Sequence, residues 1–293
     1  MAVVNVLTID VEEYFHPTEV QRTIGMEQWP SLPSRVERQT DDILALLEEK
    51  SVKATCFILG WVAERYPQLV RRIAAAGHEI GCHSYAHQLV YDLTPKQFRE
   101  DTRRAVDVIA DITGEAPRAY RAPSYSITER SLWALEILVE CGFVCDSSIY
   151  PISHDRYGIP GSHRKAHTIE TPGGRILEVP IATAQLRYGG IAPIGGGAYL
   201  RLLPYRYTAA GVRRLNSLEQ MPACVYFHPW EIDPDHPRLA QGLASSFRTY
   251  AGLRGMRSKL ERLLQDFRFS TLASVYPDAA LNGGVREQGV GAP

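Results

Sequence analysis

Acidic side chains crowd the end of the first apolar run in the sequence. The stretch "LTIDVEEYFHP" contains Asp10, Glu12 and Glu13, and it also contains His16, three residues after Glu13. Closely spaced carboxylates repel one another, and burying any of them is costly without a partner. Either these groups are solvated, or a positive charge lies among them.

Two histidines, His83 and His87, stand four residues apart in the stretch "HSYAH". On a helical turn both imidazoles would project to one side, and neutral imidazole binds zinc and similar divalent metals. Taken alone, such a pair is more often a surface or capping pair. With one carboxylate it supplies three ligands and leaves positions open, as in catalytic zinc sites. The same ligand set fits non-haem iron oxygenases, whose antiparallel β-folds this sequence does not resemble.

The elements that would position these groups alternate between strand and helix over the first two-thirds of the chain. The run "VVNVLTI" is rich in β-branched residues and predicts a buried strand. The clearest helix is expected over residues 94–114, with Thr94 and Gln97 as a capping box and Gly114 as the C-cap. This alternation favours parallel strands with helical crossovers.

Polar residues follow most of the predicted strands. In a parallel barrel the carboxyl ends of the strands open onto one face, which holds the active site. The residues at these ends are Asp10 and Glu12 after the first strand, His83 and His87 after the third, Arg121 after the fourth, Asp146 after the fifth, and His228, Glu231 and Asp233 after a late strand. We therefore expect side chains far apart in the sequence to converge.

Composition and charge exclude several classes of protein. The 293 residues are 45% hydrophobic and 22% charged, with a formal net charge of -1, which indicates a globular protein and gives no sign of a nucleic-acid partner. The five cysteines are odd in number and dispersed, so we expect reduced thiols. The amino terminus lacks the features of a signal peptide, and no apolar run is long enough for a transmembrane helix. These features predict a cytoplasmic protein.

Five motifs, in this order and spacing, resemble the polysaccharide deacetylase family, which is the NodB-homology domain of a carbohydrate esterase family. They are "TIDVEEYF", "HSYAH", "RAPSY", "CDSSIY" and "YFHP". The glutamate in the first motif and the stretches "GGGAYLRLLPY" and "FHPWEIDPDHPR" resemble a subgroup tied to bacterial exosortase-linked exopolysaccharide loci. The resemblance implies an α/β fold, an irregular (β/α) barrel of about seven to eight strands.

The same resemblance, together with the composition of each segment, predicts the domain organisation. Residues 1–276 are expected to form a single deacetylase-type barrel. Residues 150–205, which are rich in proline and contain three consecutive glycines, are predicted to be a loop-rich insertion over the catalytic face. Residues 229–276 would be a subgroup-specific extension, and residues 277–293 a disordered tail.

The resemblance also implies roles for individual residues. Asp10 matches the general base of the family and Arg121 the arginine that pairs with it. His83 and His87 match the two histidine ligands of the metal. The family's usual second aspartate is Val11 here, so Glu12 would be the third ligand, as in members with an Asp-x-Asp arrangement.

Further roles concern the acid and the substrate. His228 matches the general acid, and Asp146 the aspartate that orients it. A backbone N–H of Ser124 or Tyr125 would stabilise the oxyanion. The predicted substrate-binding residues are Ser124, Tyr125, Tyr150, Tyr226 and Trp230.

The implied reaction is metal-dependent removal of N-acetyl groups from the amino sugars of a bacterial exopolysaccharide or its precursor. The expected cofactor is a divalent metal, zinc first, with cobalt, nickel or manganese as alternatives. The expected partner is an N-acetylated glycan, with peripheral association to a membrane-linked glycan assembly system. Two other functions stay open: hydrolysis of a non-sugar or cyclic amide, and an inactive carbohydrate-binding barrel.

Overall fold

One large sheet runs through the centre of the protein. The structure is a computed structural model that describes residues 3–186 and 189–277. Within these ranges nine strands form the sheet in the order β10-β1-β2-β3-β4-β5-β7-β6, with β11 paired to the start of β1. The strands are β1 (Asn5–Val11), β2 (Thr55–Ile58), β3 (Glu79–Cys82), β4 (Ala119–Tyr120), β5 (Cys145–Asp146), β6 (His167–Thr171), β7 (Gly174–Glu178), β10 (Cys224–Phe227) and β11 (Phe269–Ser270). All neighbouring strands are parallel except β6 and β7, which confirms the predicted α/β fold class.

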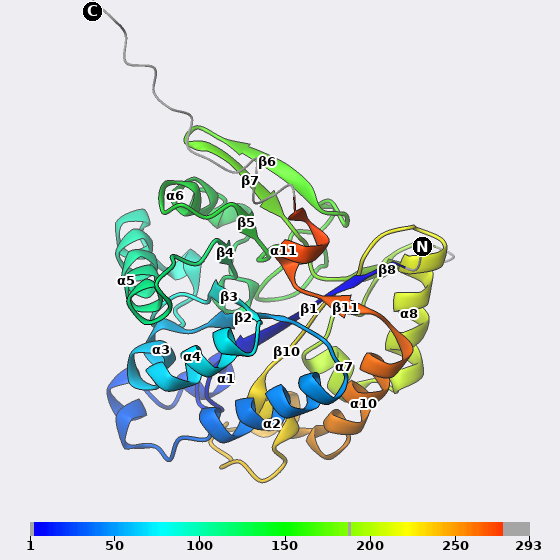
Figure 1. The fold of residues 1–293 in the computed structure, drawn as a ribbon, viewed down its shortest axis with the longest axis horizontal. Coiled ribbons are helices and arrows are strands. Elements are labelled where there is room, and N and C mark those ends of the chain that lie inside the picture. Colours follow the sequence, from blue (N-terminus) through cyan, green and yellow to red (C-terminus); the bar gives the residue numbers. More distant parts are fainter. Residues whose placement is uncertain (1–2, 187–188, 278–293) are drawn as a thin grey trace, which may run out of the picture.

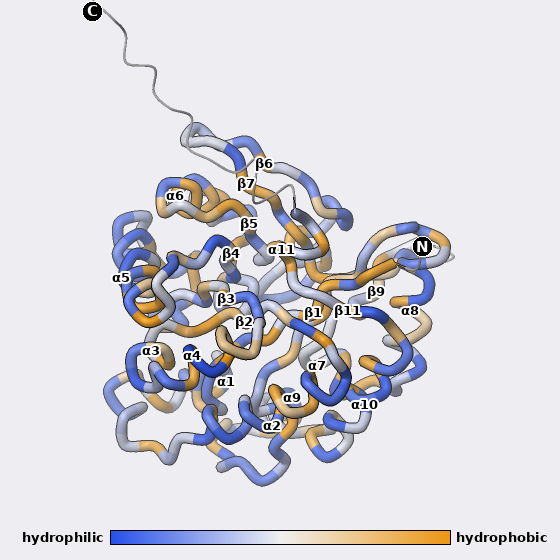
Figure 2. Tube along the Cα trace, viewed as in Figure 1, coloured by the Kyte–Doolittle hydropathy of each residue, from blue (hydrophilic) through white to orange (hydrophobic). Residues whose placement is uncertain are grey.

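Helices surround the strands, with α3 to α6 on the left of Figure 1 and α8 and α10 on the right. The helices are α1 (Thr18–Gln21), α2 (Val36–Glu49), α3 (Gly60–Arg65), α4 (Pro67–Ala75), α5 (Pro95–Thr113), α6 (Ala134–Glu140), α7 (Ala198–Leu202), α8 (Tyr205–Ser217), α9 (Leu243–Tyr250), α10 (Leu253–Asp266) and α11 (Leu272–Val275), and short 3-10 turns include η3 (Pro123–Tyr125) and η5 (Pro229–Ile232). Every residue of β1 is buried. Figure 2 shows hydrophobic stretches in the central strands and mainly hydrophilic loops at the periphery.

The ends of α5 show how the sequence sets element boundaries. The hydroxyl of Thr94 accepts a hydrogen bond from the Gln97 N–H at 3.3 Å, and the Gln97 side chain accepts one from the Thr94 N–H at 2.9 Å. Gly114 ends the helix with φ of 83°, a conformation that glycine adopts without strain. This helix therefore lies where the capping pattern predicts it.

The barrel is irregular because no strand ladder joins β7 to β10 in the part of the chain that the structure describes. Isolated backbone hydrogen bonds cross this gap. The N–H of Ala182 donates to the carbonyl of Cys224 at 3.0 Å, and the N–H of Tyr226 donates to the carbonyl of Gly195 at 2.7 Å. The ring is thus completed by single contacts rather than by paired strands.

The segment predicted to be an insertion, residues 150–205, contributes partly to the barrel. Its strand β7 pairs with β5 in the main sheet, and a small separate sheet pairs β8 (Thr183–Gln185) with β9 (Ile191–Pro193). Residues of the loop before β6 and of α7 line the cavity described below.

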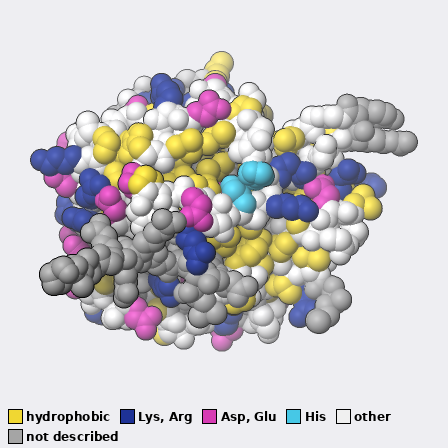
Figure 3. All heavy atoms as spheres, turned by 90° about the horizontal axis from the view of Figure 1, so that it is seen from above, with side chains coloured by type: hydrophobic (Ala, Val, Ile, Leu, Met, Phe, Trp, Pro, Cys, Tyr) yellow, Lys and Arg dark blue, Asp and Glu magenta, His cyan; other side chains and the backbone are white. Residues whose placement is uncertain are grey.

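The carboxyl-terminal segment, residues 229–276, also joins the barrel, because β11 pairs with β1. The predicted disordered tail lies outside the described residues apart from Pro277. Among the described helices, none has the length and apolar character needed to cross a membrane. On the face shown in Figure 3, acidic and basic side chains are interspersed among hydrophobic ones.

Candidate active site

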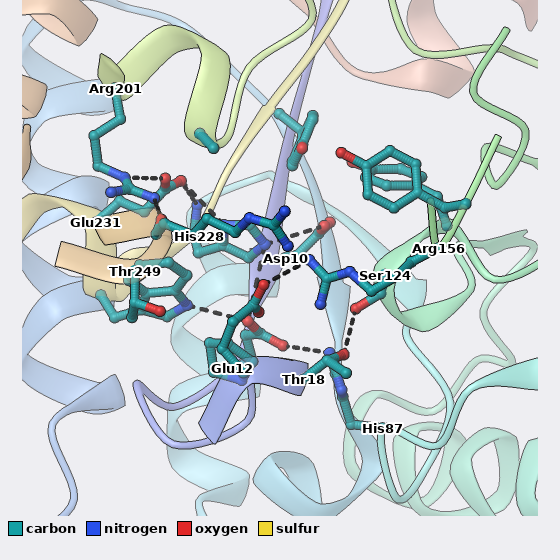
Figure 4. Close-up of a pocket in the computed structure, with 18 of the residues that line it drawn as sticks. Asp10, Glu12, Thr18, His87, Ser124, Arg156, Arg201, His228, Glu231 and Thr249 are labelled. Carbon is teal, nitrogen blue, oxygen red and sulfur yellow. Dashed lines mark hydrogen bonds and ion pairs between the residues drawn. The ribbon is translucent and has the colours of Figure 1, made fainter. Parts of the chain in front are cut away.

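The carboxyl ends of the strands surround a cavity of about 280 Å³, shown in part in Figure 4. The sequence-predicted residues that line it are Asp10, Glu12, His83, His87, Ser124, Tyr125, Tyr226, His228 and Trp230. Arg121, Asp146 and Tyr150 are fully buried outside this lining. The structure therefore brings most of the predicted residues to one place.

Three buried side chains at the floor of the cavity form a potential metal site. Single donor atoms of Glu12, His83 and His87 all lie within 4.8 Å of one another. Oε2 of Glu12 is 2.7 Å from Nε2 of His87 and 4.0 Å from Nε2 of His83. Burial alone would raise the pKa of Glu12, but three neighbouring imidazoles hold it far below its usual range. Burial lowers the pKa of His83 to about 4, so this ring is neutral at pH 7, as a ligand must be.

The surroundings of these three side chains suit a divalent cation. Nδ1 of His83 lies 2.8 Å from the carbonyl of Arg121, so an Nδ1–H donating there leaves Nε2 free to coordinate. Oε1 of Glu12 accepts a hydrogen bond from the Trp230 indole at 3.0 Å. Oε2 is buried and lies 2.7 Å from Nε2 of His87. Two acceptor atoms this close repel each other unless a proton or a cation lies between them, and a divalent cation would bind both.

The backbone around the two histidines differs from the predicted helical turn. The chain after β3 is a loop, in which Ser84 has φ of 61° and His87 has φ of 52°. Ser124 and Tyr125, in the turn that follows the neighbouring strand β4, have φ of 50° and 54°. These four are among only six non-glycine residues with positive φ in the described ranges. Such conformations cost about 1–3 kcal/mol each and cluster at functional sites.

Asp10 is held by a buried guanidinium. Nη1 of Arg121 donates to Oδ1 of Asp10 at 2.8 Å and to the hydroxyl of Thr8 at 2.7 Å. Nε of the same arginine donates to the carbonyl of Ser147 at 3.1 Å. Burial opposes the charge of Arg121, yet the Asp10 carboxylate raises its pKa above the ordinary value. The pair fixes the orientation of the carboxylate at the cavity floor.

His228 points into the cavity from the end of β10 and is held from behind by Glu231. Its Nδ1 lies 3.0 Å from Oε2 of Glu231, and its Nε2 is 3.8 Å from both Asp10 and Glu12. Oε1 of Glu231 accepts a hydrogen bond from Nε of Arg201 at 3.0 Å, and Figure 4 shows the three side chains in a row. Burial opposes the charge, but Glu231 raises the pKa of His228 to about 9. The ring is therefore protonated at pH 7.

The predicted contact between Asp146 and His228 is wrong, because Glu231 occupies that position. Asp146 and Glu178 are direct partners in the ladder of β5 and β7, so their side chains meet away from the cavity. Asp146 accepts a hydrogen bond from the Ser148 hydroxyl at 2.6 Å, and Glu178 accepts one from the N–H of Ile149 at 3.0 Å. Burial raises the pKa of both carboxyl groups. The hydrogen bonds of this pair hold the chain directly after β5, and the pair does not orient His228.

Tyr150 is also displaced from its predicted position in the substrate groove. It is fully buried and packs on the rings of Tyr125 and Tyr157, with centroids 5.5 and 5.9 Å away. Tyr125 and Tyr157 themselves line the cavity, so Tyr150 supports the wall from behind.

Two family models match consecutive parts of the chain. Residues 30–143 match the family described as "Polysaccharide deacetylase". Residues 30–143 therefore form a polysaccharide deacetylase domain of the NodB-homology type. Residues 147–277 match a family described as "Domain of unknown function (DUF3473)". His228 lies in the stretch matched by this second model.

Sequence similarity to individual proteins covers about a third of the chain, whereas structural similarity covers nearly all of it. A peptidoglycan-N-acetylglucosamine deacetylase of Bacillus cereus is 38% identical over 98 residues, covering 33% of this chain and only 36% of that protein. A solved structure from Mycobacterium smegmatis, assigned as a polysaccharide deacetylase, has a TM-score of 0.65 at 16% identity and covers 100% of this chain and 99% of that one. The PuuE allantoinase has a TM-score of 0.61 at 16% identity, covering 93% and 88%. These structures establish the fold alone.

Several lining residues have no role assigned to them by the sequence. Glu231 is among the strand-end residues expected to converge, and the structure places it in the cavity lining behind His228. Arg201 lies in the predicted insertion, and only the fold reveals its approach to Glu231. His154, Arg156 and Tyr157, from the loop before β6, also line the cavity.

Proposed function

We propose that this protein is a metal-dependent hydrolase that removes N-acetyl groups from amino sugars of a polysaccharide. The observation that carries the proposal is the arrangement at the cavity floor, where a carboxylate held by an arginine and a protonated histidine flank a three-ligand metal site. Amide hydrolysis needs a base for water, an acid for the departing amine and stabilisation of the oxyanion.

Glu12, His83 and His87 would hold the cation, with zinc as the first expectation and cobalt, nickel or manganese as alternatives. Three protein ligands with open positions are characteristic of catalytic zinc sites. When bound, the metal would supply Lewis-acid chemistry at the amide carbonyl. The position of Oε2 of Glu12, beside Nε2 of His87 and Nε2 of His83, supports the view that a glutamate, one methylene longer than aspartate, serves as ligand here.

Proton transfer would fall to two side chains that meet in the cavity, where Nε2 of His228 lies 3.8 Å from Oδ2 of Asp10. Asp10, fixed by Arg121, would accept the proton of the attacking water. His228, protonated because Glu231 raises its pKa to about 9, would donate to the amine as it departs. Different surroundings thus keep one group as base and the other as acid.

The oxyanion would be stabilised by a backbone N–H of the turn after β4. Both predicted donors, Ser124 and Tyr125, line the cavity. The N–H of Tyr125 already donates to the carbonyl of Ala122 at 3.1 Å, so we favour the N–H of Ser124. The Ser124 hydroxyl pairs with that of Thr18 at 2.8 Å, which fixes the turn from the other side of the cavity. Tyr226 and Trp230 would contact the sugar.

The finer parts of the proposal concern the substrate and its location. The Bacillus cereus relative is named for peptidoglycan N-acetylglucosamine, whereas the motifs of the second half resemble the exopolysaccharide-associated subgroup. We propose a bacterial exopolysaccharide or its precursor as the substrate. A cytoplasmic position with peripheral association to a membrane-linked glycan assembly system remains part of this proposal.

Acetate release tests the proposal directly. The purified chain is assayed on N-acetylglucosamine oligomers and on a panel of small and cyclic amides, and its metal content is measured by elemental analysis. We expect acetate from the oligomers and close to one divalent metal per chain. Asp10→Asn should lower turnover by about 10²- to 10⁴-fold while retaining the metal, and His83→Ala should lose both.

Other outcomes would replace the proposal. Hydrolysis confined to the cyclic amides would indicate a non-sugar amidohydrolase. Glycan affinity with neither metal nor acetate release would indicate an inactive carbohydrate-binding barrel. A fully active Asp10→Asn variant would exclude Asp10 as the base.

A further inference from the structure

A second hollow adjoins the catalytic cavity. It has a volume of about 320 Å³ and shares four lining residues with the first: Tyr91, His154, Arg156 and Tyr157. The two hollows are therefore parts of one groove that extends from the metal site across the loop before β6. We call the second hollow, lined by these four residues together with Thr128, Arg130, Asp155 and Gly158, the outer groove. A groove of this form can hold the sugar next to the one being deacetylated.

Aromatic rings form the walls of the outer groove. The His154 and Tyr157 rings are stacked, with centroids 3.8 Å apart and planes inclined by 16°. The guanidinium of Arg130 lies over the Tyr91 ring, 5.3 Å from its centroid. Burial lowers the pKa of His154, so its ring is mainly neutral at pH 7. Flat rings with few polar groups are typical of sites that bind ligands with one apolar face.

Three arginines, Arg130, Arg156 and Arg248, and two carboxylates, Glu19 and Asp155, lie in or beside the outer groove, so its net charge is positive. Nη2 of Arg156 lies 2.6 Å from Glu19, which offsets that arginine. The exposed Asp155 on the rim lies 3.9 Å from Arg248 and 3.0 Å from His154. Arg130 has no carboxylate within 4.0 Å among the residues that the structure describes.

One nitrogen of the Arg156 guanidinium also lacks a hydrogen-bond acceptor in the described protein. Its Nε is buried and makes no hydrogen bond within the described chain. Figure 4 shows its side chain extending from its loop toward the catalytic cavity. A guanidinium presents donors in a planar fork that matches a carboxylate in two parallel hydrogen bonds. An anionic ligand in the groove would thus meet one uncompensated arginine and one unused donor.

We propose that the outer groove binds a carboxylate-bearing sugar that neighbours the N-acetylated one, so that the substrate is an acidic glycan. This inference rests on the proposed function for the identity of the neighbouring sugar. The carboxylate lies against Arg130, and the ring of the sugar lies against Tyr91 and the outer face of the His154 ring, which is stacked on Tyr157. Net attraction to an acidic chain also steers it toward the cavity at low ionic strength.

Binding by the full-length chain tests the outer groove without requiring turnover. Calorimetry compares tetragalacturonate with cellotetraose, a neutral tetramer, because neither carries an acetyl group. We expect tetragalacturonate to bind roughly tenfold more tightly than cellotetraose, and Arg130→Gln to remove roughly five- to tenfold of that preference. Arg71→Gln, an exposed arginine on α4 outside both hollows, is the matched control and should change neither affinity.

Three results would overturn the inference. They are equal affinity for the two tetramers, the same loss in Arg130→Gln and Arg71→Gln, and displacement of tetragalacturonate by inorganic phosphate at equal concentration, which would indicate a phosphate site. Failure of the proposed function looks different, because the wild-type chain would then release no acetate from any oligomer while the binding preference persisted.

Discussion

Replacing Glu231 by glutamine tests whether His228 acts as an acid whose proton is held by a buried carboxylate. Glu231 is inaccessible to solvent, the His228 side chain is 18% exposed, and their contact is 3.0 Å long. Unit charges about 3 Å apart attract by about 5 kcal/mol at an effective dielectric constant of about 20. Burial opposes this attraction, and the pKa of His228 is raised from 6.5 to about 9. The difference of about 2.5 pH units corresponds to about 3 kcal/mol.

The sign of the effect follows from the raised pKa. His228 is protonated below about pH 9 and loses its proton as the pH rises through that value. Glu231→Gln removes the largest of the charges that raise this pKa, so the alkaline limb of the kcat/KM profile should move to lower pH. In the limit where Glu231 supplies the whole shift, the protonated fraction at pH 8 would fall from about 0.9 to about 0.03, a loss of about 30-fold. At pH 5.5 the variant and the wild type should differ little.

The pH profile of acetate release, measured with both proteins loaded with the same metal, checks this expectation. Glu231→Asp, which keeps the charge, should retain most of the alkaline limb. Asp146→Asn tests whether Asp146, the partner expected from the sequence, supports His228 instead of Glu231. Because the structure pairs His228 with Glu231, this variant should keep the alkaline limb at the wild-type pH. A profile that falls by the same factor at every pH in Glu231→Gln, or that shifts in Asp146→Asn, would refute the reasoning.

Two further substitutions probe the supports of the site. Arg201→Ala removes the hydrogen-bond donor of the buried Glu231 carboxylate and of the carbonyls of Arg248 and Ala251. The free energy of unfolding, measured by urea titration, should therefore fall by about 3–5 kcal/mol. A loss below about 1 kcal/mol would contradict the buried ion pair. Gly196→Ala places a Cβ 1.8 Å from the carbonyl oxygen of Tyr226, at φ of 127°, so we expect a loss of at least about 3 kcal/mol and of activity. Gly114→Ala, at φ of 83° with no neighbour within 4 Å, is its control and should cost only about 1–2 kcal/mol.

Local patterns in the sequence were sufficient to predict which strand ends converge. Asp10, Glu12, His83 and His228 meet because parallel strands direct their carboxyl ends to one face. The same rule places Asp146 at the end of β5 but says nothing of the direction of its side chain. That direction depends on the register of β5 with β7, and β7 lay in a segment predicted to be an insertion.

Other features depend on contacts that local patterns do not contain. His87 reaches Glu12 through a loop with left-handed residues, whereas its spacing from His83 indicated a helical turn. Arg201 approaches Glu231 only because α7 packs beside η5 in the folded chain. The roles of these residues in catalysis stay predictions until the substitutions are measured.

The pairing of β1 with β10 has a consequence for how the active site assembles. The proposed base and metal ligands all precede residue 143, whereas the proposed acid follows residue 147 and belongs to the stretch matched by the second family model. The strand register joins Val6 to Cys224, so these two parts meet across more than two hundred residues of chain. Closing so long a loop is slow, because its entropy cost is offset only after the intervening strands and helices have formed their contacts. Neither part alone contains a complete set of the proposed proton-transfer groups, so the proposed chemistry requires both parts to be folded together.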